Sequence, residues 1–304
     1  MKKELHVLAG PTAVGKTSLS IKYAKTLNAE IISADSIQVY KHMDIGSAKI
    51  TAEEMQGIPH HLIDCLEPTE NFDVARFVSM AKEAMNTIYD KGKIPLVVGG
   101  TGFYLHALIY DNDFSDGASD PEYRSSLEEE AKDPANDLYE RLKSTDPEAA
   151  EAIPPGNVKR VIRALEYFHV TGQKISVHNR EEREKESPYD LRFYVLNMPR
   201  EQLYQRINLR VDKMVEEGLF EETEALIRMG VEPGMTSMQG LGYRQAYLYL
   251  TGKYSKEEAI DAIKKETRHF AKRQLTWFRK EREAVFVDKS EYESEDEIID
   301  KMLR

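Results

Sequence analysis

The stretch Leu5-His-Val-Leu-Ala-Gly10-Pro-Thr-Ala-Val-Gly15-Lys-Thr17 decides the fold of this chain. Residues 5–9 form a short apolar run that predicts a buried strand, and residues 16–27 show a helical pattern. Between them, residues 10–17 match the Walker A pattern, in which a glycine-rich turn aims backbone N–H groups at phosphate oxygens. A tight turn before a helix is the alternative, but the strand–turn–helix context favours phosphate binding.

The pattern predicts a diphosphate site rather than ATP hydrolysis as such. In this site, Lys16 supplies a positive charge and the Thr17 hydroxyl is the candidate ligand for Mg²⁺. The predicted diphosphate-binding residues of the loop are Gly10, Pro11, Thr12, Ala13, Val14, Gly15, Lys16 and Thr17.

Strand and helix patterns alternate on both sides of this loop. Strands are expected at residues 5–9, 30–34, 61–66, 94–98 and 192–197, with a last short one at 284–288, and helices at 16–27, 73–90 and 102–110. Such alternation is typical of a parallel sheet covered by helices. The predicted fold class is therefore α/β: a P-loop parallel sheet flanked by helices, with a mainly helical insertion domain and a helical C-terminal half.

The domain boundaries follow from a change in composition. Residues 1–110 and 191–304 are expected to form the P-loop core with its C-terminal helices, and residues 111–190 the helical insertion. The clearest helix of the insertion should begin after Asn157 as N-cap and end at Gly172. Its predicted apolar stripe consists of Val158, Val161, Ile162, Leu165 and Phe168.

Charge is strongly segregated along the 304 residues. The net charge of −11 argues mildly against an RNA partner when taken alone. Residues 264–282, however, hold eight Lys or Arg against two Glu, whereas residues 120–151 hold eleven Asp or Glu against four Lys or Arg. A local basic surface is therefore compatible with an acidic protein.

The single cysteine and the hydropathy pattern indicate the compartment. Cys65 cannot form an internal disulfide, which fits a reducing cytoplasm, and we expect it to be a small buried hydrophobe. No apolar run approaches about 18 residues, so neither a membrane span nor secretion is expected.

Two further polar residues follow predicted strands. Asp35 directly follows the expected strand at 30–34. Thr101 follows the apolar residues 95–98 and is separated from them by Gly99 and Gly100. The carboxyl ends of strands in an open α/β sheet face the ligand crevice, so both side chains should approach the P-loop ligand. Asp35 could bind Mg²⁺, bind the acceptor of a kinase or act as a general base; a turn aspartate is the alternative.

Taken in order, five motifs resemble those of the bacterial tRNA dimethylallyltransferases, also called tRNA isopentenyltransferases. They span nearly the whole chain, and the second and fifth are far more specific than the P-loop. The motifs are residues 10–17, Asp35-Ser-Ile-Gln-Val-Tyr-Lys41, Gly99-Gly-Thr-Gly-Phe-Tyr104, Gly240-Leu-Gly-Tyr-Arg-Gln245 and Thr267-Arg-His-Phe-Ala-Lys-Arg-Gln-Leu-Thr-Trp-Phe-Arg279.

The resemblance implies a reaction and a set of catalytic residues. The expected reaction transfers a dimethylallyl group from dimethylallyl diphosphate to N6 of the adenosine immediately 3′ of the anticodon, position 37, and releases diphosphate. Lys16 and Mg²⁺ would then act on a leaving diphosphate, Asp35 would accept a proton or hydrogen bond from N6, and Thr101 would lie beside the reaction centre. Arg210 would reach the diphosphate from another part of the chain.

The same resemblance implies an RNA-binding surface. The target base must leave its stack, so aromatic and arginine side chains that hold a splayed loop are expected near residues 272–279. The alternative is a long helix with Trp277 and Phe278 in the core. The implied tRNA-binding residues are Asp35, Ser36, Ile37, Gln38, Thr101, Arg124, Lys159, Arg160, Val161, Ile162, Arg163, Gly242, Tyr243, Lys272, Arg273, Trp277 and Arg279.

The expected partners are the tRNA anticodon stem-loop and dimethylallyl diphosphate, for a cytoplasmic monomer that does not bind membranes. Without the resemblance, the favoured hypothesis would be a P-loop kinase of a small metabolite or nucleotide. A non-catalytic RNA-binding switch is a third hypothesis, but it leaves Asp35 without a role.

Overall fold

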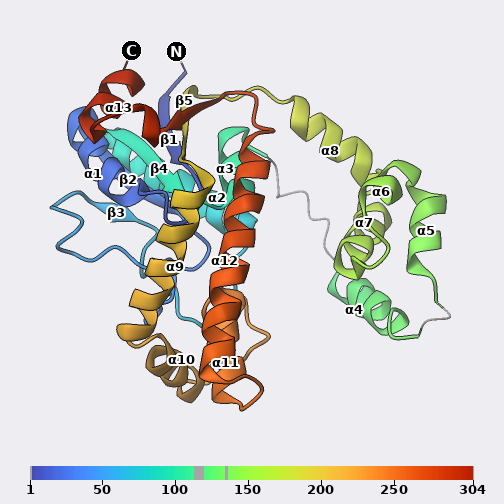
Figure 1. Cartoon of the computed structure of the whole chain (residues 1–304). Coiled ribbons are helices and arrows are strands. Elements are labelled where there is room, and N and C mark those ends of the chain that lie inside the picture. The colour runs from blue at the N-terminus through green and yellow to red at the C-terminus, as the bar shows by residue number, and fades with distance from the viewer. Residues whose placement is uncertain (1, 113–119, 134–135, 304) are drawn as a thin grey trace. The chain divides into compact units, whose positions relative to one another are not determined.

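The computed structural model describes residues 2–112, 120–133 and 136–303. The chain divides into two compact units, each with its own core. The first consists of Met1–Ile109 and Pro188–Arg304, and the second is Tyr110–Ser187. Figure 1 shows both, with the second unit formed by helices α4 to α8.

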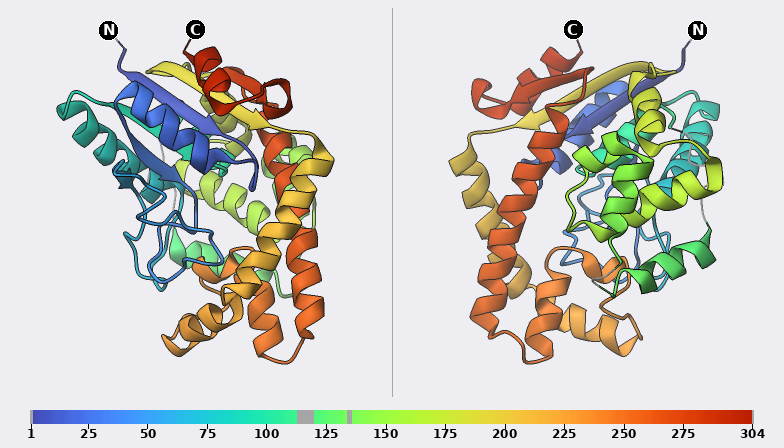
Figure 2. Two further views of the ribbon diagram at one scale, coloured as in Figure 1. Left: turned by 60° about the vertical axis from the view of Figure 1, so that its left-hand side comes forward. Right: turned by 90° about the vertical axis from the view of Figure 1, so that its right-hand side faces the viewer.

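A six-stranded sheet organises the first unit. All its strands pair in parallel, in the order β3-β2-β4-β1-β5-β6 (Figure 2). The strands β1, β2 and β4 are mostly apolar and almost entirely buried, as expected for the central strands of a parallel sheet. The predicted parallel α/β architecture is thus confirmed. The strand bounds are β1 (Glu4–Ala9), β2 (Ala29–Ala34), β3 (His60–His61), β4 (Ile94–Gly99), β5 (Asp190–Asn197) and β6 (Ala284–Asp288).

Helices cover the sheet and extend beyond it. In both views of Figure 2, α9 and α12 run away from the sheet towards α10 and α11, with which they form a helical bundle. Among the helices in the described parts of the chain, none has the length and hydropathy needed to cross a bilayer. The helices of this unit are α1 (Lys16–Leu27), α2 (Val74–Asp90), α3 (Gly102–Ile109), α9 (Arg200–Glu216), α10 (Leu219–Arg228), α11 (Tyr243–Leu250), α12 (Lys256–Phe278) and α13 (Glu295–Met302), with short 3₁₀ turns η1 (Ser237–Gln239) and η2 (Lys289–Glu291).

The strand expected at 61–66 is much shorter than predicted. It ends at His61 because Leu62 and Asp64 adopt positive φ angles of 62° and 53°, which extended strands do not contain. The N–H groups of Cys65 and Leu66 instead donate to the Val39 carbonyl. Cys65 is exposed in this turn, so the prediction of a buried cysteine was wrong.

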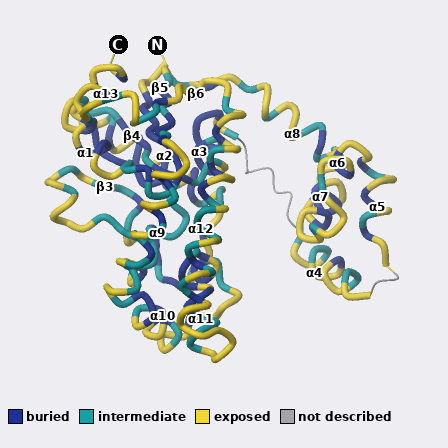
Figure 3. The backbone as a smooth tube through the Cα atoms, in the orientation of Figure 1, coloured by how far each residue is buried: buried dark blue, intermediate teal, exposed yellow. Residues whose placement is uncertain are grey.

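The second unit is helical, with a small apolar core of its own. Its helices are α4 (Pro121–Glu130), α5 (Leu138–Thr145), α6 (Pro147–Ala152), α7 (Val158–Thr171) and α8 (Ile175–Glu184). Helix α7 begins after Asn157 and ends at Gly172 in the left-handed conformation, although the Asn157 side chain makes no capping hydrogen bond. Val158 and Phe168 are 42% and 38% exposed, so the buried stripe is narrower than predicted. Figure 3 shows that buried and exposed residues alternate along the helices of this unit.

A buried carboxylate ties together the amino ends of β2 and β4. Glu30 is 1% exposed, and its oxygens lie 2.8 Å from His61 Nε2, 2.9 Å from Lys91 Nζ and 3.0 Å from Lys93 Nζ. Burial alone would raise the pKa of Glu30, but the three hydrogen bonds outweigh it and lower the pKa to about 2. Glu30 therefore remains ionised in the folded protein at neutral pH.

Substitution of Glu30→Gln should reduce the free energy of unfolding at pH 7 by about 2 kcal/mol, because it removes the anion that balances Lys91 and Lys93. Glu30 stabilises the fold fully above its unfolded pKa and progressively less as pH falls towards about 2. The difference from wild type should therefore shrink between about pH 5 and pH 2 in urea titrations. Asp190→Asn, which changes an exposed carboxylate on β5, is the control; a difference for Glu30→Gln that stays constant with pH would contradict this assignment.

Candidate active site

The P-loop joins the end of β1 to the start of α1. Gly15 caps α1 in the left-handed conformation, with φ of 96°, which favours glycine at this position. Ala13 also has a positive φ, of 64°. The turn therefore places the N–H groups of the first turn of α1 at the carboxyl edge of the sheet, where an anion is favoured.

Lys16 folds back over this loop. Its ammonium donates to the carbonyl oxygens of Gly10 and Pro11, each at 2.9 Å. Burial, followed by repulsion from Arg210, lowers the pKa of Lys16 to about 8, and attraction to Asp35 opposes the shift in part. The negative charge of a diphosphate would offset both the cost of burying Lys16 and its repulsion from Arg210, so the loop is electrostatically suited to an anion. Thr17, the next residue, is exposed on the first turn of α1.

Asp35 follows β2, and its side chain shapes the turn after that strand. One oxygen, Oδ1, accepts hydrogen bonds from the N–H groups of Ile37 at 2.9 Å and Gln38 at 3.3 Å. The Gln38 amide accepts from Ser33 Oγ at 3.2 Å and donates to the carbonyls of residues 47 and 48. Asp35, Ser36, Ile37 and Gln38 are all half-buried. Asp35 can therefore stabilise the turn and still be a candidate catalytic residue, because Oδ1 alone accepts both hydrogen bonds of the turn.

Thr101 lies beside Asp35 because β4 pairs with β2. The register aligns Gly99 with Ala34, and the N–H of Thr101 donates to the Ala34 carbonyl at 3.4 Å. Thr101 is half-buried, at the point where α3 begins. The strand order β2-β4-β1 thus brings Asp35, Thr101 and the P-loop together, as predicted from their positions at strand ends.

Two arginines of α9 complete the charged site. Arg210 is coupled electrostatically to both Lys16 and Asp35, and burial lowers the pKa of its guanidinium. One turn earlier, Arg206 Nε donates to the Ala13 carbonyl of the P-loop at 2.8 Å. Sequence reasoning did not assign Arg206 a role, although its i, i+4 spacing from Arg210 could have indicated one.

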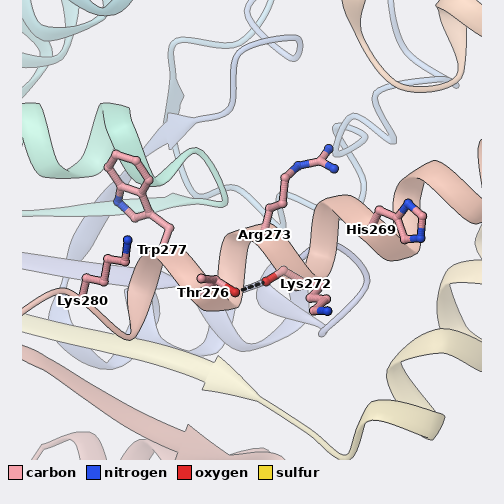
Figure 4. A pocket seen from close by; sticks show the side chains of 6 residues that line it. All are labelled: His269, Lys272, Arg273, Thr276, Trp277 and Lys280. Carbon is pink, nitrogen blue, oxygen red and sulfur yellow. Dashed lines mark hydrogen bonds between the residues drawn. The ribbon is translucent and has the colours of Figure 1, made fainter. Parts of the chain in front are cut away.

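Helix α12 carries an exposed basic and aromatic face. Five of its side chains and Lys280, just beyond its end, line an open pocket of about 420 Å³, shown in Figure 4: His269, Lys272, Arg273, Thr276, Trp277 and Lys280. The Trp277 ring lies edge-on to Phe103 of α3, with centroids 6.2 Å apart, and is 38% exposed. Phe278 is fully buried, so only one of these two aromatic residues belongs to the core. Arg279 is exposed at the end of the helix.

The inward side of the same helix contains a glutamine that sequence reasoning missed. Gln274 is buried, its Oε1 accepts from the Thr12 N–H at 3.0 Å, and its Nε2 donates to the Gly100 carbonyl at 2.8 Å. It therefore joins the P-loop to the turn that follows β4. A glutamine inside a basic helical motif gives no local signal for this role.

Helix α7 of the second unit exposes part of its predicted basic patch. Lys159, Arg160 and Arg163 are exposed, but Val161 and Ile162 are 2% and 5% exposed and belong to the core. The side chains of Val161 and Ile162 therefore pack in the core of this unit, and the assignment of the segment 159–163 to RNA binding remains a prediction. Arg124 and Arg163 each bind the buried Glu166, at 2.7 Å and 3.3 Å. Both arginine side chains therefore also stabilise the fold of this unit through Glu166.

Gly242 and Tyr243 are also buried. The Tyr243 hydroxyl donates to Glu222 at 2.7 Å, and its ring packs so closely on Gly46 that a Cβ there would lie 2.5 Å from the ring. Glu222 also accepts hydrogen bonds from the N–H groups of residues 44, 45 and 46. These residues therefore anchor a loop to the helical bundle, and their assignment to tRNA contact remains a prediction.

Comparison with known proteins gives a consistent result. Residues 38–281 match the IPP transferase family. The chain is 54% identical over 301 residues to a tRNA dimethylallyltransferase of Lachnoclostridium phytofermentans, covering 99% of this chain and 96% of the relative. It is 49% identical over 294 residues to a tRNA dimethylallyltransferase of Acetivibrio thermocellus, covering 96% and 94%.

Solved structures agree. The crystal structure of the full-length tRNA isopentenylpyrophosphate transferase from Bacillus halodurans superposes with a TM-score of 0.76 at 44% identity, covering 99% of this chain and 95% of that one. A eukaryotic dimethylallyltransferase, whose structures capture it acting on tRNA, superposes with a TM-score of 0.84 at 31% identity. That match covers 98% of this chain and 78% of the eukaryotic one.

The lowered pKa of Lys16 predicts that pyrophosphate binding weakens in alkaline solution. Above about pH 8 the unliganded protein loses the Lys16 charge, so affinity should fall by up to about tenfold per pH unit. Calorimetric titration with inorganic pyrophosphate should show this fall relative to Lys16→Arg, which keeps its charge and corrects for ionisation of the ligand. A ratio of the two affinities that does not change between about pH 7 and pH 9.5 would refute the shifted pKa.

Proposed function

This chain belongs to the IPP transferase family, which includes the tRNA dimethylallyltransferases named above, and is an enzyme of the transferase class. From that premise we propose that it transfers a dimethylallyl group from dimethylallyl diphosphate to N6 of the adenosine at tRNA position 37, with release of diphosphate. The observation that carries this proposal is the convergence of Lys16, Arg210, Asp35 and Thr101 at one edge of the sheet. A small-molecule kinase is not favoured.

The cations at this edge act on the leaving group. As the allylic C–O bond breaks, its electron pair passes to the diphosphate oxygen, and negative charge develops there. Lys16, Arg210 and the N–H groups of the P-loop lie where that charge appears, so they stabilise the transition state more than the ground state. Their mutual repulsion before substrate binds is consistent with this role.

Asp35 and Thr101 act on the nucleophile. The adenine N6 attacks the allylic carbon, a new N–C bond forms, and one N6 proton must leave. Asp35 is positioned to accept it, since Oδ1 is held by two backbone N–H groups while the carboxylate faces the charged edge. Thr101, on the neighbouring strand end, helps to place the adenosine.

The residues present fit a Mg²⁺ ion bound mainly through substrate. No group of three or more acidic, histidine or cysteine side chains that could hold a metal occurs within the described residues. Mg²⁺ commonly uses one or two protein oxygens together with phosphate oxygens and water. The exposed Thr17 hydroxyl on the first turn of α1 is such a ligand, and the ion would neutralise charge on the diphosphate.

We propose one tRNA-binding surface on each unit: α12 in the first unit and the exposed part of α7 in the second. Lys272, Arg273 and Arg279 supply phosphate contacts, and Trp277 offers a ring on which an unstacked base can lie. In the second unit we propose Lys159 and Arg160, with Arg124 and Arg163 as residues shared between RNA and Glu166. The proposed partner is the anticodon stem-loop, bound by a monomer in the cytoplasm.

Asp35→Asn should abolish most of the transfer while preserving the turn, because the amide keeps an oxygen acceptor but cannot take up the N6 proton. We expect kcat to fall by about 10²- to 10⁴-fold, with pyrophosphate affinity within about threefold of wild type. The measurement uses purified protein, dimethylallyl diphosphate, Mg²⁺ and an unmodified tRNA transcript with an adenosine at position 37.

In this assay, a transcript carrying guanosine at position 37 is the matched substrate control and should give no product. Failure of the wild-type protein to prenylate the adenosine transcript would overturn the proposed function. So would rapid consumption of ATP with a small-molecule acceptor.

Arg273→Ala should weaken tRNA binding and make it less sensitive to salt. Loss of one phosphate contact reduces the slope of log affinity against log salt concentration by about 1. Arg228→Ala, which removes an exposed arginine paired with Glu224 at the end of α10, is the matched control and should leave the slope unchanged. Equal slopes for Arg273→Ala and wild type would remove this face of α12 from the RNA site.

A further inference from the structure

We infer that Gln274 is a positioning residue for the transfer reaction, because its side chain fixes the P-loop relative to the turn that carries Thr101. The inference rests on the proposed function and concerns the alignment of the two substrates. Gln274 itself does not have to contact either of them. Its two hydrogen bonds, at 3.0 Å to the Thr12 N–H and 2.8 Å to the Gly100 carbonyl, reach loops far away in the sequence.

The approach of Gln274 to Gly100 requires a residue without a side chain. A Cβ on Gly100 would lie 2.3 Å from Gln274 Nε2 and 3.3 Å from the Gly10 carbonyl oxygen. That same carbonyl accepts the hydrogen bond from Lys16 Nζ. Gln274, Gly100 and the start of the P-loop are therefore in direct contact, and movement of any one of them changes the surroundings of Lys16.

The connection also reaches Asp35. Thr101 follows Gly100 directly, and its N–H donates to the carbonyl of Ala34, the residue before Asp35. Through Gly100, one amide side chain from α12 is thus linked to the carboxyl ends of β1, β4 and β2. These three ends carry the cation that faces the diphosphate, the residue beside the reaction centre and the proposed base.

This arrangement matters because the reaction joins two substrates held by different loops. The P-loop fixes the leaving diphosphate, and hence the allylic carbon, whereas Asp35 and Thr101 fix N6. A misplacement of about 1 Å between such groups can cost about 100-fold in rate. A link that sets the distance between the loops therefore affects turnover more than the binding of either substrate.

Glutamine suits this position because it offers a donor and an acceptor on one rigid plane. An ionised glutamate could accept from Thr12 but would repel the Gly100 carbonyl, and methionine of similar length could do neither. Packing of Ala271 and Phe278, which are fully buried on either side, holds α12 in place independently. Loss of the Gln274 amide should consequently loosen the loops without displacing the helix.

The test compares Gln274→Met with Gln245→Met in the transfer assay. Gln245 is a buried glutamine that also makes two hydrogen bonds, to the Gly242 N–H at 3.0 Å and to Glu266 at 2.8 Å, but it does not join the catalytic loops. We expect Gln274→Met to lower kcat by about 10- to 100-fold with KM for tRNA changed by less than about threefold. Gln245→Met should keep kcat within about threefold of wild type.

Gln274→Glu provides a second measurement, the pH dependence of kcat, which tests whether the two hydrogen bonds of Gln274 affect turnover. The protonated carboxylic acid reproduces the shape and both hydrogen bonds of the glutamine, whereas the ionised form does not. The kcat of Gln274→Glu relative to wild type should therefore rise as pH is lowered, and the same ratio for Gln274→Met should stay constant.

The outcomes separate this inference from the function on which it rests. If wild-type protein forms no prenylated tRNA, the proposed function fails and the inference fails with it. If wild type is active, the inference alone is overturned by any of three results: equal kcat for Gln274→Met and Gln245→Met, a loss confined to KM for tRNA, or a pH-independent ratio for Gln274→Glu. A selective loss of kcat together with recovery of Gln274→Glu at low pH supports it.

Discussion

The parallel pairing of β2, β4 and β1 is the constraint on which the site depends. Their ladders align Ala34 with Gly99 and Ala9 with Gly99, so the three strands end side by side. Each strand is followed at once by a functional segment: the P-loop, the Asp35 turn or the Gly100–Thr101 turn. Since parallel strands all point the same way, Asp35 and Thr101, which follow Lys16 by 19 and 85 residues, reach the same edge of the sheet. The bundle helices α9 and α12 then contribute Arg206, Arg210 and Gln274 to that edge.

Electrostatic repulsion between Lys16 and Arg210 at this edge destabilises the folded protein, and the rest of the fold must compensate for it. Lys16 and Arg210 both lose hydration and repel each other, and Asp35 balances only part of that charge. At the opposite end of the sheet the arrangement is reversed: Glu30 is an anion surrounded by three basic groups and is fully satisfied. The charges at one end of the sheet are thus balanced, whereas the other end has an excess of positive charge that the proposed diphosphate would neutralise.

Local sequence predicted the parts of the site that are set by local structure. The P-loop, Asp35 and Thr101 directly follow strands whose apolar runs are unambiguous, and the register then places them together. The orientations of residues that depend on tertiary packing could not be predicted from the local sequence. A motif such as residues 240–245 does not reveal that Tyr243 points into the bundle, and the patch 159–163 includes Val161 and Ile162, which are core residues. Arg206 and Gln274 were missed because their partners are backbone groups of a distant loop.

Helix α12 shows why one short motif can serve two purposes. Successive residues of a helix point about 100° apart, so Arg273 and Gln274 cannot face the same surroundings. Arg273, Thr276 and Trp277 line the outer pocket (Figure 4), whereas Gln274 and Phe278 are buried. The spacing of three and four residues keeps each set on its own face. One helix can therefore offer the proposed RNA contacts on its outer face and, through Gln274, the proposed alignment of the loops on its inner face.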